Sequence, residues 1–148
     1  MIALIRLALR VKSLSVHDML HELSEHKDFM DFIIELNTKN QLYEMGVNSK
    51  GESIGDYSIK TIGIKEEKGQ ITDHVTLNDT GAFYESFSVV LNSSFDFEIS
   101  ANVIKDTSNL IEDWGKEILG LNEDSLKLLR VKVKEILIPY VKQTILNR

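Results

Sequence analysis

The sequence predicts an α+β domain, in which helices precede and follow a small antiparallel strand core. Helical apolar spacing occupies the first and last parts of the chain, and apolar-polar alternation lies between them. The chain has 148 residues, the length of one ordinary domain. Its 43 % hydrophobic and 27 % charged residues are typical of sequences that fold. We therefore expect residues 1–148 to form a single domain.

Composition excludes several classes of protein. The net charge of -6 disfavours a protein whose main task is to neutralise DNA phosphates. The absence of cysteine excludes disulfides, thiolate catalysis and cysteine-ligated metal sites, and fits a reducing cytosol. Arg6 and Arg10 interrupt the apolar start of the chain, so we expect no signal peptide. No stretch of about 18 nearly uncharged apolar residues occurs, so we expect a soluble protein with no membrane partner.

The N-terminal part predicts helix. Residues 1–14 fit both helical and strand periodicity, and we expect a helix there. Ser15 with Asp18 three residues later is typical of a helix N-terminus. The apolar series that follows predicts one long helix over residues 16–44, which ends at Gly46.

Residues 46–74 predict an extended polar loop. Three of the eight glycines lie within residues 46–57, and no convincing periodicity follows up to Thr72. A stretch this long without regular structure is usually functional or mobile, and we expect it to contact partners. Its candidate contact residues are Tyr57, Lys60, Lys65 and Lys68. Glu66 and Glu67 offset these lysines, which makes a solvated surface the simpler interpretation.

Residues 75–103 predict the strand core. Alternation over 83–91 and 95–101, separated by Asn92-Ser93-Ser94, indicates a hairpin with a bulge or turn near Phe83. The expected apolar face consists of Phe83, Phe87, Val89 and Leu91 with Phe95, Phe97, Ile99 and Ala101. We expect its phenylalanines to form the core on which the helices pack.

Residues 107–146 predict two closing helices. The first begins at Thr107 or Ser108, places Trp114 on its apolar face and stops at Gly120. The second begins after Asn122, and Pro139 is expected to kink or break it.

Three motifs suggest catalysis or ligand binding, and each has a simpler interpretation. Asp79-Thr80-Gly81 matches the catalytic tripeptide of retroviral-type aspartic proteases, but Asn78 precedes it and no glycine-rich flap is present. The simpler interpretation is a turn in which Asp79 accepts backbone N–H bonds and Gly81 adopts a positive φ.

The other two motifs depart from their patterns in the residue that does the chemistry. His17 and His21 have zinc-ligand spacing on a helix, but Asp18 stands where a glutamate base is required. Residues 46–53 have P-loop spacing, but Glu52 replaces the phosphate-binding lysine. We expect no metal, no cofactor and no catalytic residue.

The stretch from Val75 to Val89 resembles a segment of small virion proteins of tailed bacteriophages. In their tail-completion or head-tail joining proteins, this pattern begins a strand after a long loop. The matching positions are Leu77, Asp79, Thr80, Gly81, Phe83, Ser86 and Phe87. The order of expected elements is also similar, whereas the extended final helix and Pro139 depart from the family.

The resemblance implies a noncatalytic virion protein that forms a ring at the head-tail junction. Its implied partners are copies of itself and the portal, adaptor and tail proteins, with at most non-specific proximity to genomic DNA. Its implied locations are the virion and, during assembly, the host cytoplasm. The alternatives are an aspartic-protease-like enzyme that uses Asp79 and a small monomeric adaptor.

Overall fold

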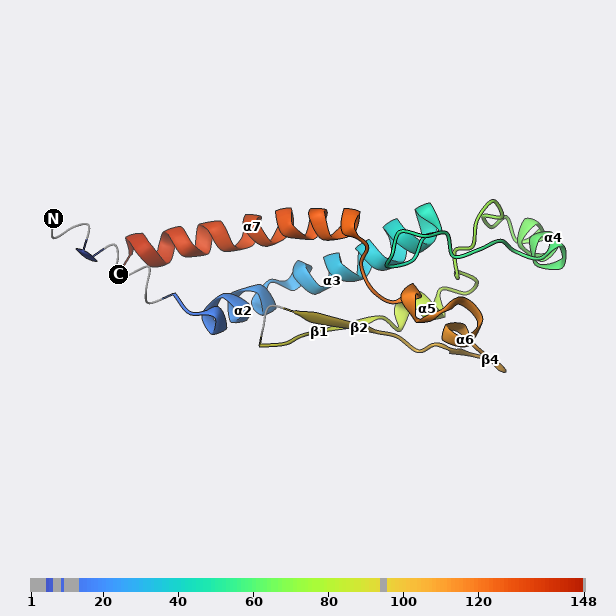
Figure 1. Cartoon of the computed structure of the whole chain (residues 1–148), viewed down its shortest axis with the longest axis horizontal. Helices are drawn as coiled ribbons and strands as arrows, with labels where there is room; N and C mark the ends of the chain where they lie inside the picture. Colours follow the sequence, from blue (N-terminus) through green and yellow to red (C-terminus); the bar gives the residue numbers. More distant parts are fainter. Residues whose placement is uncertain (1–4, 7–8, 10–13, 94–95, 148) are drawn as a thin grey trace.

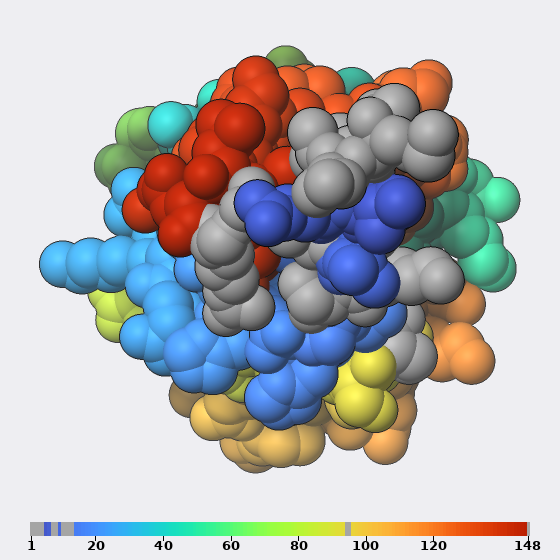
Figure 2. All heavy atoms as spheres, turned by 90° about the vertical axis from the view of Figure 1, so that its left-hand side faces the viewer, coloured from blue at the N-terminus to red at the C-terminus, as the bar shows by residue number. Residues whose placement is uncertain are grey.

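The computed structural model of the protein describes residues 5–6, 9, 14–93 and 96–147. It confirms the expected α+β class, with N-terminal helices, two small antiparallel sheets and a long C-terminal helix. Figure 1 shows an elongated molecule in which α7 (Glu123–Leu146) lies along one side and the strands lie along the other. The N-terminal helices lie between them, and the end-on view in Figure 2 shows the same order of layers. The helix expected over residues 1–14 falls largely outside the described residues.

The helix expected over residues 16–44 is divided. Its first part, α2 (Val16–Glu25), begins as expected at Ser15, whose Oγ accepts the N–H of Asp18 at 3.0 Å. The prediction of one continuous helix was wrong at His26, where the backbone is extended (φ -73°, ψ 108°). Apolar residues keep their spacing across this break, so periodicity alone does not reveal it.

Two further helical segments follow His26. They are α3 (Lys27–Glu35) and the π-helix η1 (Leu36–Met45). The series ends at Gly46 as predicted, in the left-handed conformation (φ 62°) that glycine adopts readily.

Buried amides of η1 hold the chain that leads into α7. The Asn37 side chain donates to the carbonyl of Ile118 at 3.0 Å and accepts the N–H of Gly120 at 2.8 Å. The Gln41 side chain donates to the Gly120 carbonyl and accepts the N–H of Asn122, both at 2.9 Å. These four bonds satisfy backbone groups that would otherwise be buried without partners.

The predicted hairpin is confirmed. It consists of β1 (Ser88–Leu91) and β2 (Phe97–Ser100), which pair antiparallel. Val89 lies opposite Ile99, and Leu91 lies opposite Phe97, so these side chains share one face as expected. That face packs against α3, and Phe95 lies outside the described residues.

The strand expected to begin at Phe83 begins only at Ser88. Ala82–Glu85 form a short helical turn, α5, which confirms the expected turn near Phe83. Phe87 follows this turn and is buried, and its ring contacts that of Phe83 edge-on with 5.1 Å between centroids.

The polar stretch 46–74 is not a loop throughout, because α4 (Ile59–Glu67) lies within it. Ser58 caps this helix by accepting the N–H of Thr61 at 3.2 Å. The sequence hides α4 because it spans nine residues, contains Gly63 and buries only Lys65, so no apolar stripe marks it.

The first closing helix is also much shorter than expected. A second small hairpin, β3 (Ile104–Lys105) with β4 (Ser108–Asn109), precedes α6 (Leu110–Trp114). Gly115, at φ 87°, separates α6 from the short 3₁₀ helix η2 (Lys116–Ile118). The apolar spacing that suggested one helix is shared by the two pieces.

α7 begins after Asn122 as predicted and runs through Pro139 without interruption. The prediction that Pro139 breaks the helix was wrong. Proline removes one backbone donor, and Pro139 is exposed, so water can satisfy the carbonyl that loses its partner.

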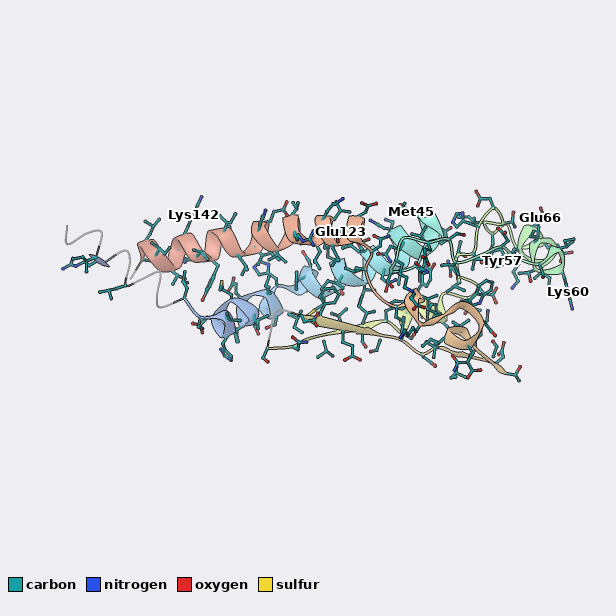
Figure 3. The ribbon with its side chains drawn as sticks, viewed as in Figure 1. Met45, Tyr57, Lys60, Glu66, Glu123 and Lys142 are labelled. Carbon is teal, nitrogen blue, oxygen red and sulfur yellow. The ribbon has the colours of Figure 1, made fainter. Side chains whose placement is uncertain are left out.

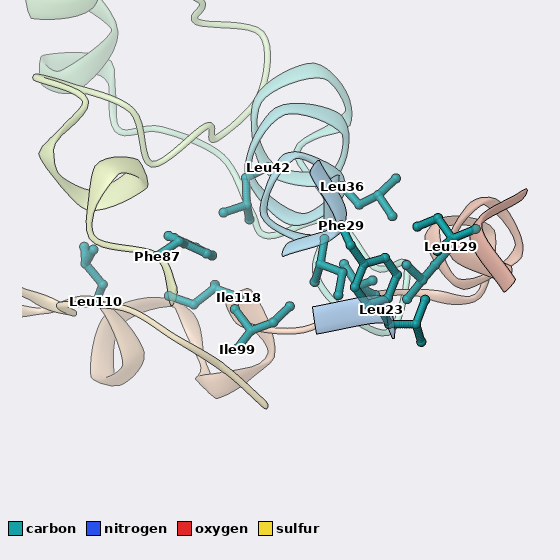
Figure 4. Packing of buried hydrophobic residues seen from close by; sticks show 12 residues of the cluster. Leu23, Phe29, Leu36, Leu42, Phe87, Ile99, Leu110, Ile118 and Leu129 are labelled. Atoms are coloured by element: carbon teal, nitrogen blue, oxygen red, sulfur yellow. The ribbon is translucent and has the colours of Figure 1, made fainter. Parts of the chain in front are cut away.

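The core runs along the molecule between these layers. Figure 4 shows it extending from Leu23 and Leu129 at one side to Phe87 and Leu110 at the other. Phe87 belongs to the buried set, whereas Phe83, Phe97 and Trp114 are half-buried and pack against it. The expected contribution of the phenylalanines to the core is thus strongest for Phe87.

Candidate functional site

Residues 46–74, which we call the arm, carry α4 to one end of the molecule. Figure 1 shows α4 at the opposite end from the C-terminal end of α7. In Figure 3, Tyr57, Lys60 and Glu66 are gathered around this helix. The contact residues predicted from the sequence therefore lie at a projecting end of the structure.

Lys65 fixes the base of the arm. It is only 7 % exposed, and its Nζ donates to the carbonyl of Asn78 at 2.9 Å and to the side-chain oxygen of Gln70 at 3.3 Å. The ammonium also lies 4.8 Å from the centre of the Tyr57 ring, a cation-π contact. Lys65 is thus an anchor within the protein and not a free surface charge.

Two tyrosines bind Thr76, which lies in the segment before the turn. The Tyr57 hydroxyl accepts the N–H of Thr76 at 2.8 Å and lies 3.2 Å from the Thr76 hydroxyl. The Tyr84 hydroxyl donates to the carbonyl of Thr76. Burial raises the pKa of Tyr84, so this hydroxyl keeps its proton. Thr76 itself is buried.

Asp79 is held by two lysines. Its Oδ1 accepts from Lys68 Nζ at 2.7 Å, and its Oδ2 accepts from Lys105 Nζ at 3.0 Å. These two hydrogen bonds lower the pKa of Asp79 to about 2. The backbone carbonyl of Asp79 also accepts from the side chain of Gln70 at 2.8 Å.

The turn at 79–81 is confirmed in one respect and corrected in another. Gly81 has a φ of 89°, as the turn interpretation requires. The backbone donors expected to reach Asp79 are replaced by the two lysine ammonium groups. The N–H of Ala82 donates instead to the hydroxyl of Thr80, at 3.3 Å.

Ser86 closes the other side of the turn. Its Oγ donates to the carbonyl of Phe83 at 2.6 Å and accepts the N–H of Asn102 at 2.9 Å. The matched serine of the phage-like pattern thus ties the helical turn to the segment after β2.

A cavity of about 720 Å³ lies between the arm, the turn and the second hairpin. Eight of the contact and motif residues singled out from the sequence line it, namely Tyr57, Lys65, Lys68, Leu77, Asp79, Thr80, Gly81 and Phe83. Lys60 lies on α4, and Ser86 and Phe87 follow α5; none of the three belongs to this lining. Gln70 and Lys105 were missed, because neither belongs to a recognisable motif.

The geometry of Asp79 opposes protease chemistry. An aspartic-protease dyad shares one proton between two carboxyl groups, which requires one carboxyl to have a raised pKa. In Asp79 both carboxylate oxygens instead accept from lysine ammonium groups, which stabilise the fully ionised carboxylate.

The two ligand motifs form other contacts. His17 and His21 lie near Asp18 and Glu25, at 3.8 Å and 4.0 Å, on the exposed surface of α2. Within the described ranges, no group of three or more His, Asp or Glu side chains is placed to hold a metal ion.

In the segment with P-loop spacing, the Asn48 side chain accepts the N–H groups of Lys50 and Glu52. Those donors are therefore engaged within the loop itself.

Among the described residues, no helix combines the length and apolar character needed to cross a membrane. No family model, curated protein or solved structure matches this chain.

Proposed function

We propose that this protein is a noncatalytic structural protein of a tailed phage or prophage that assembles as a ring at the head-tail junction. Its partners are further copies of itself and the portal, adaptor and tail proteins. It acts in the virion, after assembly in the host cytoplasm. The observation that carries the proposal is the arm, whose base is fixed while its tip is exposed.

The tip of the arm presents apolar surface. Ile59, the first residue of α4, is 91 % exposed, and Ile64 on the same helix is 45 % exposed. Exposed large apolar side chains at a projecting tip suit a protein contact. Because Lys65, Gln70 and Tyr57 hold the base, little conformational entropy remains to be lost on docking.

The cavity beneath the arm fits this structural role. Its most acidic group, Asp79, is ionised at neutral pH and already bonded to Lys68 and Lys105. The matched residues of the phage-like segment therefore join the arm to the sheet, and none of them is left as an unengaged nucleophile or base.

The experiment replaces Ile59 with glutamine, a polar residue of similar length that leaves the helix intact. A strain that lacks the gene is supplied with wild-type, Ile59→Gln or Val90→Gln protein. Val90 is the matched control, because it is also an exposed apolar residue, 63 % exposed on β1. Burying an isoleucine in a contact contributes about 1.5 to 3 kcal/mol, so its loss should be visible.

We expect all three proteins to melt at similar temperatures. Ile59→Gln should reduce the yield of complete tailed particles, and Val90→Gln should not. Equal yields for both variants would contradict the assignment of the arm tip to assembly.

A further inference from the structure

α7 has an outer face that the described part of the chain leaves uncovered. Its inner face buries Leu129 and Ile136 against the core. On the other side, Leu128, Val131 and Ile138 are 49 %, 54 % and 49 % exposed. Their spacing of three and seven residues places them along one stripe of the helix.

The same stretch of α7 is basic. From Lys127 to Lys142 it contains five basic residues and a single acid, Glu135. Lys127 and Arg130 form ion pairs with Asp124 and Glu123 in the first turns. No ion pair involves Lys134 or Lys142 within the described part of the chain, and Figure 3 shows Lys142 on the outer side of α7.

The rest of the chain has the opposite charge. Residues 15–124 contain 22 acidic and eight basic residues. A series of acids follows α2 and α3 at spacings of three or four: Asp18, Glu22, Glu25, Asp28, Asp31 and Glu35. The last three are exposed, and the described residues form no ion pair with them.

We propose that the outer face of α7 docks onto the acidic face of α2 and α3 in a second copy of this chain. The inference rests on the proposed function, which supplies the neighbouring copies. Opposite charges on two different surfaces of one molecule favour a head-to-tail contact. Such contacts close into a ring when the rotation between copies permits it.

Two other occupants fit less well. Pairing α7 with α7 of a second copy would bring the lysines of the two copies together, which is repulsive. Duplex DNA would attract the lysines, but the excess of acidic residues over positions 15–124 of the same molecule would repel it.

The test uses the absence of cysteine from the chain, which removes background crosslinking. Single cysteines are placed in separate full-length proteins, Val131→Cys on α7 and Asp28→Cys on α3. Leu129 and Phe29 line one apolar groove. Positions 131 and 28 are close to them in sequence, so the two cysteines lie at a similar level along the molecule. A second pair, Leu128→Cys with Asp31→Cys, samples a shifted register, and a short flexible bis-maleimide joins the thiols.

We expect covalent dimers when the two members of a pair are mixed. Each variant alone, or mixed with the control Val90→Cys, should stay uncrosslinked. The dimer should decrease at about 1 M salt, where the Debye length falls to about 3 Å. In the Val131→Cys and Asp28→Cys pair, adding Lys134→Glu and Lys142→Glu to the first protein should abolish crosslinking. Adding Asp31→Lys and Glu35→Lys to the second protein should then restore it.

Three outcomes would overturn the inference. Crosslinking of Val131→Cys with itself would assign α7 to a symmetric contact. No crosslinking in either mixed pair would show that the two surfaces do not meet. Duplex DNA binding that Lys134→Glu and Lys142→Glu abolish, without mixed crosslinking, would assign the face to DNA.

These results are separable from the proposed function. If complete particles require the gene but no mixed crosslinking occurs, the head-tail role holds and the copies meet through a different contact. Mixed crosslinking in a protein that particles do not require would support the contact and reject the head-tail role.

Discussion

The backbone N–H of Asn122 donates to the side-chain oxygen of Gln41 at 2.9 Å, across 81 positions of sequence. Asn122 is also the N-cap of α7, and its side chain accepts the N–H of Ser125. An amide in the π-helix η1 therefore fixes the point at which the long helix begins. This bond, together with the packing of α7 against α2, α3 and η1, sets the position of the helix.

Replacing Gln41 with leucine should destabilise the fold. Gln41 is buried, and its loss leaves the Gly120 carbonyl and the Asn122 N–H without partners. A buried polar group without a partner costs about 1 to 3 kcal/mol, so the free energy of unfolding should fall by at least that much. Urea denaturation measures it, with the exposed Lys39→Leu as control. Equal midpoints for the two variants would contradict the role of Gln41.

The Asp79 ion pairs predict a stability difference that depends on pH. The pKa of Asp79 is lowered to about 2 in the folded protein, so folding favours its ionised form. The resulting stability is fully present above the unfolded pKa of about 4 and is lost as pH falls toward 2.

Asp79→Asn should therefore lower the free energy of unfolding at pH 7 by about 1 to 2 kcal/mol, after allowance for solvent screening. The difference between variant and wild type should close near pH 2. Asp56→Asn is the control, because Asp56 lines the same cavity and forms no ion pair within the described residues. A difference for Asp79→Asn that stays constant down to pH 2 would argue against the ion pairs.

Gly46 and Gly69 form a matched pair, because their φ angles are 62° and 67°. Alanine at either position should lose about 1 to 2 kcal/mol from backbone strain. At Gly46 a Cβ would also lie 2.7 Å from a ring carbon of His74, whereas at Gly69 no atom lies within 4 Å. Gly46→Ala should therefore lower the thermal midpoint more than Gly69→Ala. The reverse order would be inconsistent with the packing of His74 against the start of the arm.

Gly63→Ala should stabilise the arm. Gly63 lies inside α4, and no atom within 4 Å would meet an added Cβ. Alanine is favoured over glycine in a helix interior by about 0.5 to 1 kcal/mol. Amide hydrogen exchange over Ile59–Glu67 should slow accordingly, while exchange in α7 stays unchanged. Faster exchange in α4 would mean that the segment is not helical in solution.

Elements with local signals were predictable from sequence. Ser15 and Asn122 mark the starts of α2 and α7, and the alternation around Val89 and Ile99 marks the hairpin. The helix α4 was not predictable, because it has no apolar stripe and contains Gly63.

The site was only partly predictable. The motif around Asp79 located the turn, but its lysine partner Lys105 lies 26 positions away and carries no motif. Gln41 was missed because a polar residue within an apolar series resembles a surface position. Contacts between distant polar residues depend on tertiary structure and leave no pattern in sequence.

The most direct test of the head-tail role is electron microscopy of particles made by a strain from which this gene has been deleted. The proposed function predicts filled heads and free tails that remain unjoined, with joining restored by the wild-type gene supplied in trans. Complete, infectious tailed particles formed without the protein would contradict it.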